Sequence, residues 1–300
     1  MSVFGAFAKG TARIWLHKRL ILWLYGMNLA FAAVILFPLR KVVQEVSKTD
    51  LADGFLTGFP LDVGLEFWSQ HRVELKTLAY VAVGLGILYL LVNVYLAGGI
   101  VAALAAERRV SLRRFMNDAA RYFGRYFRLF ILLALVLGLL AVAYKFGLSD
   151  TIAKLRKNAT TDRASSLWHA LVIVLWLAVF AFLLMVFDYA KIRTVVDCRR
   201  SMLLAAVASV AFALRRCWRT IPLFALNLVI VGALFAVYLL VESQFSSTTI
   251  ASMIGLFVVQ QLSILSRIWM RLSFFSTQLA YYKSVIESRA EPGASRKRDN

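Results

Sequence analysis

The arginines of the last apolar stretch are the residues whose type and position could do chemistry. Four polar residues share one face of a helix there, because they follow the spacing i, i+3, i+7 and i+11. They are Gln260, Ser263, Arg267 and Arg271. An arginine at mid-depth in a bilayer costs about 2.5–3.5 kcal/mol on insertion scales, and a buried guanidinium favours phosphate or carbonyl oxygens. We call these four residues the polar stripe, and we expect an anionic lipid headgroup to bind there. If the helix instead ends near Ser266, both arginines snorkel to the cytoplasmic headgroups.

Two asparagines add polar groups to other apolar stretches. Asn28 lies in the first stretch and Asn93 in the second, and no carboxylate lies inside any stretch to pair with the arginines. A polar cavity lined by these asparagines and by the polar stripe of the last apolar stretch would suit a transporter or a lipid-handling protein. Asp188, at the end of the fourth stretch, is within reach of Lys191 and Arg193. We expect structural charge pairing there.

Catalytic and metal motifs are missing from the sequence. The three histidines, His17, His71 and His169, lie far apart, and there is no GxSxG, GxxxxGK[ST] or GxGxxG sequence. Residues 38–77 carry several carboxylates but only one histidine, His71, and no HxH pattern, which favours a solvated pair of short helices around residues 54–60 over a metal site. We expect neither an enzyme, nor a cofactor, nor a metal.

The composition identifies the elements that position these residues. The chain has 300 residues, of which 61% are hydrophobic, and its mean hydropathy is +0.72. A soluble chain is about 45–50% apolar, so a water-soluble fold is excluded. Since about 20 apolar residues cross a bilayer as a helix, we predict an all-α fold with six spans. They cover residues 20–37, 78–98, 126–146, 167–187, 221–241 and 250–270.

The distribution of positive charge predicts the orientation of these spans. Of 35 Lys and Arg residues, 25 lie on the side of the two termini and 10 on the opposite side. The positive-inside rule places the first side in the cytoplasm. We expect a multi-pass protein of the cell inner (cytoplasmic) membrane with both termini cytoplasmic. Residues 1–290 would form one six-helix domain, with residues 38–77 as an external loop and residues 291–300 as a disordered basic tail.

A repeat is visible in the basic segments. An offset of 91 residues aligns the segment after the second span with the segment after the fourth, and it places Arg125 on Arg216 and Arg128 on Arg219. Residues 112–128 have an apolar and a basic face, which is typical of a helix lying in the membrane interface. We expect interfacial lipid contacts at Arg113, Arg114, Arg121, Arg125, Arg128, Arg216 and Arg219.

The N-terminus follows the same plan, with Lys9, Arg13 and His17 on its polar face. The chain thus divides into three parallel units, each an interfacial helix followed by a transmembrane hairpin. Since every unit crosses the membrane twice, successive copies keep one direction. An alternating-access transporter built from inverted halves is accordingly disfavoured.

Glycines close the second span at Gly98-Gly99, and the basic stretch RRVSLRRF precedes the third. With six spans, this plan resembles bacterial six-helix inner-membrane families that include the membrane domain attached to some glycerophosphodiesterases. The resemblance implies the general architecture and carries no catalytic motif.

The function that we expect is that of a non-enzymatic membrane scaffold or complex subunit in contact with anionic lipid. The alternative is a transporter or lipid-handling protein with a polar cavity lined by the sixth span. The expected partners are anionic lipid headgroups and a membrane protein, and no nucleic acid is expected.

Overall fold

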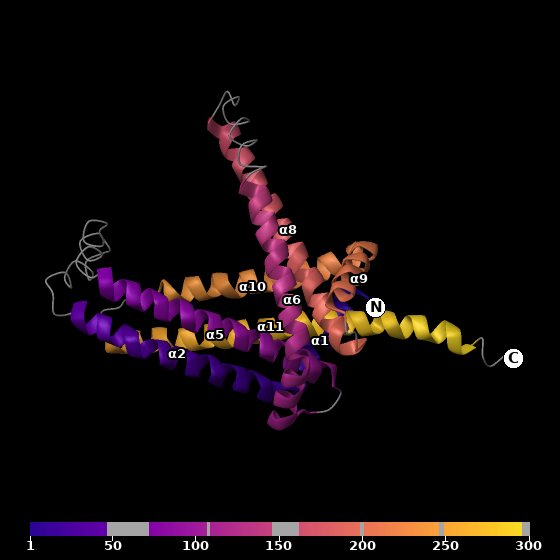
Figure 1. Ribbon diagram of the computed structural model, residues 1–300, viewed down its shortest axis with the longest axis horizontal. Coiled ribbons are helices and arrows are strands. Elements are labelled where there is room, and N and C mark those ends of the chain that lie inside the picture. The colour runs from indigo at the N-terminus through magenta and orange to yellow at the C-terminus, as the bar shows by residue number, and fades with distance from the viewer. Residues whose placement is uncertain (47–71, 107–108, 146–161, 199–200, 246–248, 296–300) are drawn as a thin grey trace. The chain divides into compact units, whose positions relative to one another are not determined.

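The computed structural model describes residues 1–46, 72–106, 109–145, 162–198, 201–245 and 249–295. These residues form helices and no strand (Figure 1). The helices are α1 (Val3–Leu16), α2 (Lys18–Val46), α5 (Arg72–Ala105), α6 (Leu112–Ala143), α8 (Asp162–Val196), α9 (Met202–Arg215), α10 (Cys217–Glu242) and α11 (Ile250–Ser295). Within the described residues, six helices are long and apolar enough to cross a membrane, namely α2, α5, α6, α8, α10 and α11. The prediction of an all-α protein with six such helices is confirmed.

The helices extend beyond the predicted spans. Helix α2 continues to Val46 and α5 begins at Arg72, so both ends of the segment predicted as an external loop are helical. The rest of that segment, residues 47–71, lies outside the described residues. Helix α11 continues to Ser295, past the predicted start of the tail at residue 291. A formed helix grows by one hydrogen bond per added residue whether or not the residue is apolar. Hydropathy therefore marks where a helix suits lipid and not where it ends.

The chain divides into two compact units, residues Met1–Ile21 with Val94–Asn300, and residues Leu22–Asn93. The smaller unit consists of parts of α2 and α5. In it, the Tyr89 hydroxyl donates a hydrogen bond of 2.6 Å to Asn28 Oδ1, and the ring of Tyr89 meets Phe31 edge-on at 5.2 Å.

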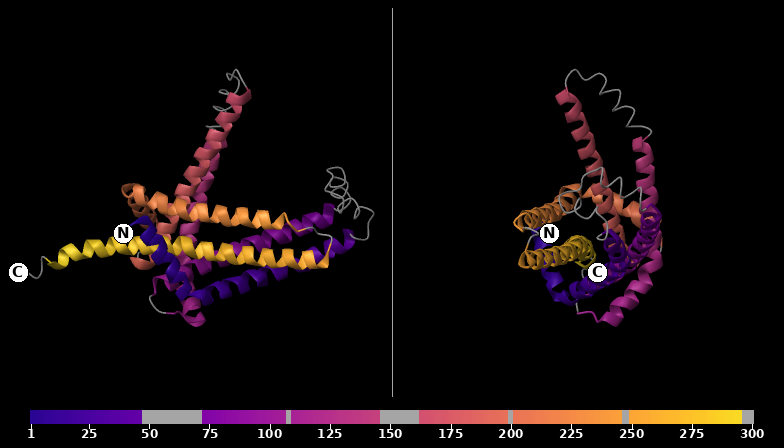
Figure 2. Two further views of the ribbon diagram at one scale, coloured as in Figure 1. Left: turned by 180° about the vertical axis from the view of Figure 1, so that it is seen from behind. Right: turned by 90° about the vertical axis from the view of Figure 1, so that its left-hand side faces the viewer.

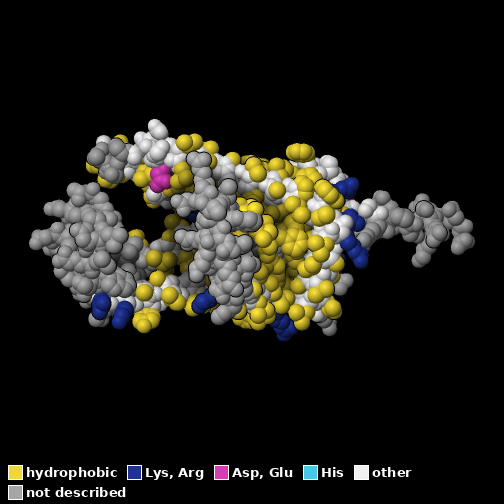
Figure 3. Space-filling model, turned by 90° about the horizontal axis from the view of Figure 1, so that it is seen from above, with side chains coloured by type: hydrophobic (Ala, Val, Ile, Leu, Met, Phe, Trp, Pro, Cys, Tyr) yellow, Lys and Arg dark blue, Asp and Glu magenta, His cyan; other side chains and the backbone are white. Residues whose placement is uncertain are grey.

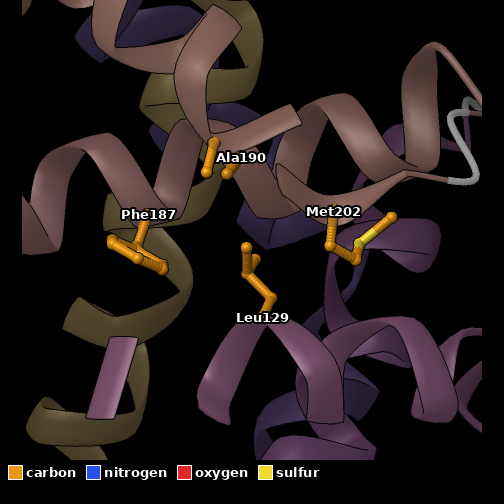
Figure 4. Packing of buried hydrophobic residues seen from close by; sticks show 5 residues of the cluster. Leu129, Phe187, Ala190 and Met202 are labelled. Atoms are coloured by element: carbon orange, nitrogen blue, oxygen red, sulfur yellow. The ribbon is translucent and has the colours of Figure 1, made fainter. Parts of the chain in front are cut away.

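The core of the larger unit lies at the helix ends that the charge distribution assigns to the cytoplasm. It combines the end of α5, the start of α6, the end of α8, all of α9, the start of α10 and the second half of α11. One cluster joins Leu129 of α6, Phe187 and Ala190 of α8, and Met202 of α9 (Figure 4). The opposite halves of α6, α8, α10 and α11 expose large apolar side chains. Figure 3 shows hydrophobic side chains, in yellow, over much of one face of the molecule. A bilayer would cover these surfaces.

Glycines permit the closest helix contacts in this core. A Cβ atom on Gly10 of α1 would lie 2.6 Å from the Cα atom of Thr277 in α11, and one on Gly99 of α5 would lie 2.8 Å from the ring of Phe115 in α6. Only glycine allows backbones to approach this closely. The short helix α1 is thereby held against α11.

Two of the three basic segments are separated from their spans by a break, and one is not. Helix α1 ends before α2 at His17, and α9 ends before α10 at Arg216. At the second break, the Thr220 hydroxyl donates to the carbonyls of Ala213 and Arg216 at 3.2 and 3.1 Å. In contrast, α6 is one continuous helix, and the residue aligned with Thr220 is Leu129, which cannot donate. The separate interfacial helix predicted for residues 112–128 is instead the first part of α6.

Candidate functional site

A groove between α10 and α11 brings together most of the polar stripe. The two helices lie side by side (Figure 2), and the groove between them has a volume of about 380 Å³. Three residues of the stripe, Ser263, Arg267 and Arg271, line it. The other lining residues are Ser266 and the apolar side chains of Val231, Leu234, Phe235, Met270 and Phe274.

This groove lies near the middle of α10. Val231 follows Cys217, the first residue of α10, by about 21 Å and precedes Glu242, the last, by about 16 Å at 1.5 Å per residue. Helix α11 does not end near Ser266 but continues to Ser295. Snorkelling serves arginines near helix ends. The position of the groove therefore favours contact of the arginines with a ligand or with lipid.

Arg267 is the more accessible of the two arginines. Its side chain is exposed, whereas Arg271 is half-buried and makes a further contact within the protein. Ion pairs between described residues join Arg114 to Asp118, Lys191 to Asp188 and Arg193 to Asp197, and Arg267 belongs to none of them. Tyr238 of α10 hydrogen bonds to Glu242 and also interacts with the charge of Arg267. Among the described residues, no carboxylate therefore forms an ion pair with the Arg267 guanidinium.

A buried polar network holds α10 against α11 next to the groove. Asn227 Nδ2 donates to the Thr277 hydroxyl at 3.1 Å, and the Ser273 hydroxyl donates to Asn227 Oδ1 at 3.0 Å. The Ser276 hydroxyl donates to the carbonyl of Gly10 at 2.7 Å, which ties α1 to the same helix. All of these side chains are buried. Since buried polar groups that lack partners are costly, this network fixes the register of α10 and α11 and with it the groove.

The sequence analysis did not identify this network. Asn227 lies between leucines in an apolar run, and its partners belong to the short polar run Ser273, Ser276 and Thr277. That run is the signal that could have indicated it, because small polar residues mediate close helix contacts in membranes.

The remaining residues of the predicted cavity are not among those that line the groove. Gln260 is exposed and is not among the lining residues of the groove. Asn28 and Asn93 belong to the smaller unit, where their amide nitrogens donate to the carbonyls of Leu24 and Tyr89, each at 2.8 Å. Hydrogen bonds within the protein thus engage the amide nitrogens of both asparagines.

The basic face of α6 is presented outward. Arg113, Arg114, Arg121 and Arg128 are exposed. The opposite face, with Phe115, Ala119, Tyr122, Tyr126 and Leu129, is buried in the core. Arg125 is half-buried, and its guanidinium lies 5.7 Å from the centre of the Tyr122 ring.

The two arginines aligned with Arg125 and Arg128 differ in exposure. Arg219 is exposed, but Arg216 is half-buried with its guanidinium 5.6 Å from the centre of the Phe212 ring. The same ring is flanked by Arg193 at 5.8 Å. Arg216 therefore packs into the cluster at the end of α8 and α9, which limits its reach toward lipid.

Asp197 belongs to this cluster and was not singled out from the sequence. Arg193 Nε donates to the Tyr282 hydroxyl at 2.8 Å, and that hydroxyl donates to Asp197 Oδ2 at 2.8 Å. The pairing expected for Asp188 is confirmed with Lys191, at 2.8 Å. These charges stabilise the ends of α8 and α11 that contribute to the core.

The periodicity of the N-terminal segment placed His17 on the polar face of α1, but His17 is not exposed there. Its side chain is buried and donates to the carbonyl of Ala106, while Lys9 on the same helix is exposed. Burial, together with the neighbouring Arg13 guanidinium, lowers the pKa of His17 below its ordinary value, although the bond to Ala106 opposes this shift. The sequence could not reveal this because the α5 end that covers His17 is distant along the chain.

Among the described residues, no group of three or more His, Cys, Asp or Glu side chains is placed to hold a metal ion. The acidic segment around His71 lies outside the described residues. Comparison of the chain with models of protein families, with curated proteins and with solved structures gives no match. The arrangement itself defines a multi-pass membrane protein with an amphipathic groove that contains two arginines.

Proposed function

We propose that the protein is a non-enzymatic scaffold or complex subunit of the cell inner membrane, with both termini in the cytoplasm and a basic face that binds anionic lipid. The observation that carries this proposal is the outward presentation of four α6 arginines opposite a face that is buried in the core. Each Lys or Arg near an anionic leaflet contributes about 1 kcal/mol of attraction. Several in one row would therefore enrich anionic lipid around this end of the protein.

The proposal includes the three-unit plan, with α1, the first part of α6 and α9 at the cytoplasmic interface. Each of these helices begins at a serine whose side chain accepts a hydrogen bond from the first turn, namely Ser2, Ser111 and Ser201. On α1, the side chains of Phe4 and Trp15 are exposed, and on α9 those of Leu203, Val207 and Leu214. Such outward apolar side chains suit helices that contact lipid on one side and protein on the other.

Charge reversal on α6 tests this proposal. The variant carries Glu in place of the four exposed arginines, Arg113, Arg114, Arg121 and Arg128. Arg125 is left unchanged because it is half-buried, whereas the other four are exposed. The matched control carries Lys at the same four positions, which keeps the charge.

Both variants and the parent are extracted in mild detergent from membranes of mixed phosphatidylglycerol and phosphatidylcholine, and the co-purified lipid is quantified. We expect the parent and the Lys control to be enriched in phosphatidylglycerol and the Glu variant to lose this enrichment. Equal enrichment in all three proteins would contradict the proposed lipid contact.

The alternative is a lipid-handling protein or transporter, and the groove between α10 and α11 favours it. A scaffold that is stabilised only by contacts between its helices has no need for two arginines opposite the middle of a span. In both cases the activity is binding and not catalysis.

A further inference from the structure

The groove between α10 and α11 has the chemistry of an amphiphile site. On one side it offers the guanidinium groups of Arg267 and Arg271 with the hydroxyls of Ser263 and Ser266. Its remaining wall is apolar and consists of Val231, Leu234, Phe235, Met270 and Phe274. A ligand that satisfies both parts must combine an anionic group with hydrocarbon.

We propose that this groove binds the phosphate of a single anionic phospholipid, with the acyl chains along the apolar wall. The proposal rests on the proposed function insofar as the protein must span a membrane, but it concerns residues other than the basic face of α6. It places a lipid headgroup opposite the middle of a span, away from the surface of the bilayer.

The spacing of the arginines fits one phosphate group. Arg267 and Arg271 are four residues apart, which is about 6 Å along the axis of α11 and on the same face. A planar guanidinium donates two parallel hydrogen bonds to phosphate oxygens, and two such groups one turn apart can hold one phosphate between them. Arg267, the exposed member, supplies the main contact, and the half-buried Arg271 completes it.

The hydroxyl of Ser266 is already engaged within α11. It donates a hydrogen bond to the backbone carbonyl of Ser263 at 2.7 Å, so its proton is not available to a ligand. The positive charge of the groove thus comes from the arginines. A zwitterionic headgroup would also bring its own cationic group close to the guanidinium of Arg267, and like charges repel strongly in a low-dielectric region. This favours an anionic over a zwitterionic headgroup.

The geometry also favours a lipid over a soluble phosphate compound. Apolar side chains form most of the wall, and the neighbouring turns of α10 and α11 expose Leu228, Val229, Phe257 and Leu262. Surfaces of this kind face hydrocarbon in a membrane protein. A ligand can therefore reach the groove from the bilayer without passing through water.

Native mass spectrometry of the purified full-length protein in detergent tests the proposal. Three probes are titrated: dimyristoyl phosphatidylglycerol, dimyristoyl phosphatidylcholine and inorganic phosphate. We expect one phosphatidylglycerol to bind more tightly than further copies and more tightly than phosphatidylcholine, and inorganic phosphate not to displace it. Equal affinity for both lipids, or displacement by inorganic phosphate, would overturn the proposed lipid specificity.

Variants locate the site. Arg267→Ala should weaken the tightest site about tenfold, which is about 1.4 kcal/mol, and Arg267→Lys should have a smaller effect because an ammonium lacks the fork geometry. The matched control is Arg215→Ala, which removes an exposed arginine from the end of α9 and should leave the tightest site unchanged. If Arg267→Ala binds like the parent, the site is not this groove.

Ser263→Phe provides a second test that keeps both arginines. A phenyl group on this half-buried position would fill part of the 380 Å³ groove and should exclude the acyl chains. Undiminished lipid binding by this variant would contradict the proposal. Thermal unfolding of every variant is measured alongside, and only variants that unfold at the temperature of the parent are compared. If the groove variants bind lipid like the parent and the α6 charge reversal abolishes lipid enrichment, the basic face of α6 remains the lipid contact and only the groove site is refuted.

Discussion

Replacing Gly10 by alanine tests whether α1 packs against α11 as the structure describes. A Cβ atom at this position would lie 2.6 Å from Thr277 Cα and 2.7 Å from Thr277 N. Both are backbone atoms of a helix and cannot rotate away, so α1 must shift. The shift would also stretch the 2.7 Å hydrogen bond from the Ser276 hydroxyl to the carbonyl of Gly10.

The magnitude follows from these two contacts. Overpacking typically costs about 1–3 kcal/mol, and a buried hydroxyl left without its acceptor costs about 1–3 kcal/mol more. The higher helix propensity of alanine offsets about 1 kcal/mol. We therefore expect Gly10→Ala to lower the free energy of unfolding by roughly 1–5 kcal/mol.

Thermal unfolding in detergent, followed by far-ultraviolet circular dichroism, measures this effect. The matched control is Gly124→Ala in α6, where a Cβ atom would meet nothing within 4 Å. This control gains helix propensity without a clash, so it should unfold at or above the temperature of the parent. If Gly10→Ala behaved like Gly124→Ala, the close contact between α1 and α11 would be refuted.

Two further predictions concern buried polar groups. Asn227→Leu removes the partner of Ser273 and Thr277 and should lower the free energy of unfolding by about 1–3 kcal/mol. The control Asn117→Leu changes an exposed residue and should have little effect. Equal unfolding temperatures for both variants would count against the network. Because the pKa of His17 is lowered in the folded protein, the unfolded chain binds more protons below the ordinary pKa, and stability should fall as the pH drops from 7 to 5. His17→Gln should reduce this pH dependence, and an unchanged dependence would assign it to other groups.

Local spacing was sufficient to predict the spans and the arginine stripe. A run of apolar residues needs no partner to identify it, and the i, i+3, i+7, i+11 spacing alone places Ser263, Arg267 and Arg271 on one face. These three residues do line one groove. Gln260 fits the same periodicity but lies outside the groove, because the groove is limited by the side chains of α10 and not by the pattern on α11.

Contacts between distant segments could not be predicted in this way. The Gly10 carbonyl and the Ser276 hydroxyl are separated by almost the whole chain, and no local pattern connects them. The break before α10 likewise depends on the Thr220 hydroxyl reaching back to Ala213. The aligned segment of α6 lacks this donor and stays helical, although Arg125 and Arg128 align with Arg216 and Arg219. Periodicity thus could not predict whether such a segment separates from its span.

The topology is the central claim, and substituted-cysteine labelling in intact cells tests it most directly. In a background with Cys198→Ser and Cys217→Ser, single cysteines are placed at three exposed positions, Ser111, Lys145 and Ser243. A membrane-impermeant maleimide should label the cysteines at positions 145 and 243 from outside, and the cysteine at position 111 only after the membrane is permeabilised. Labelling of position 111 in intact cells, with protection of positions 145 and 243, would contradict the cytoplasmic placement of the basic helix ends.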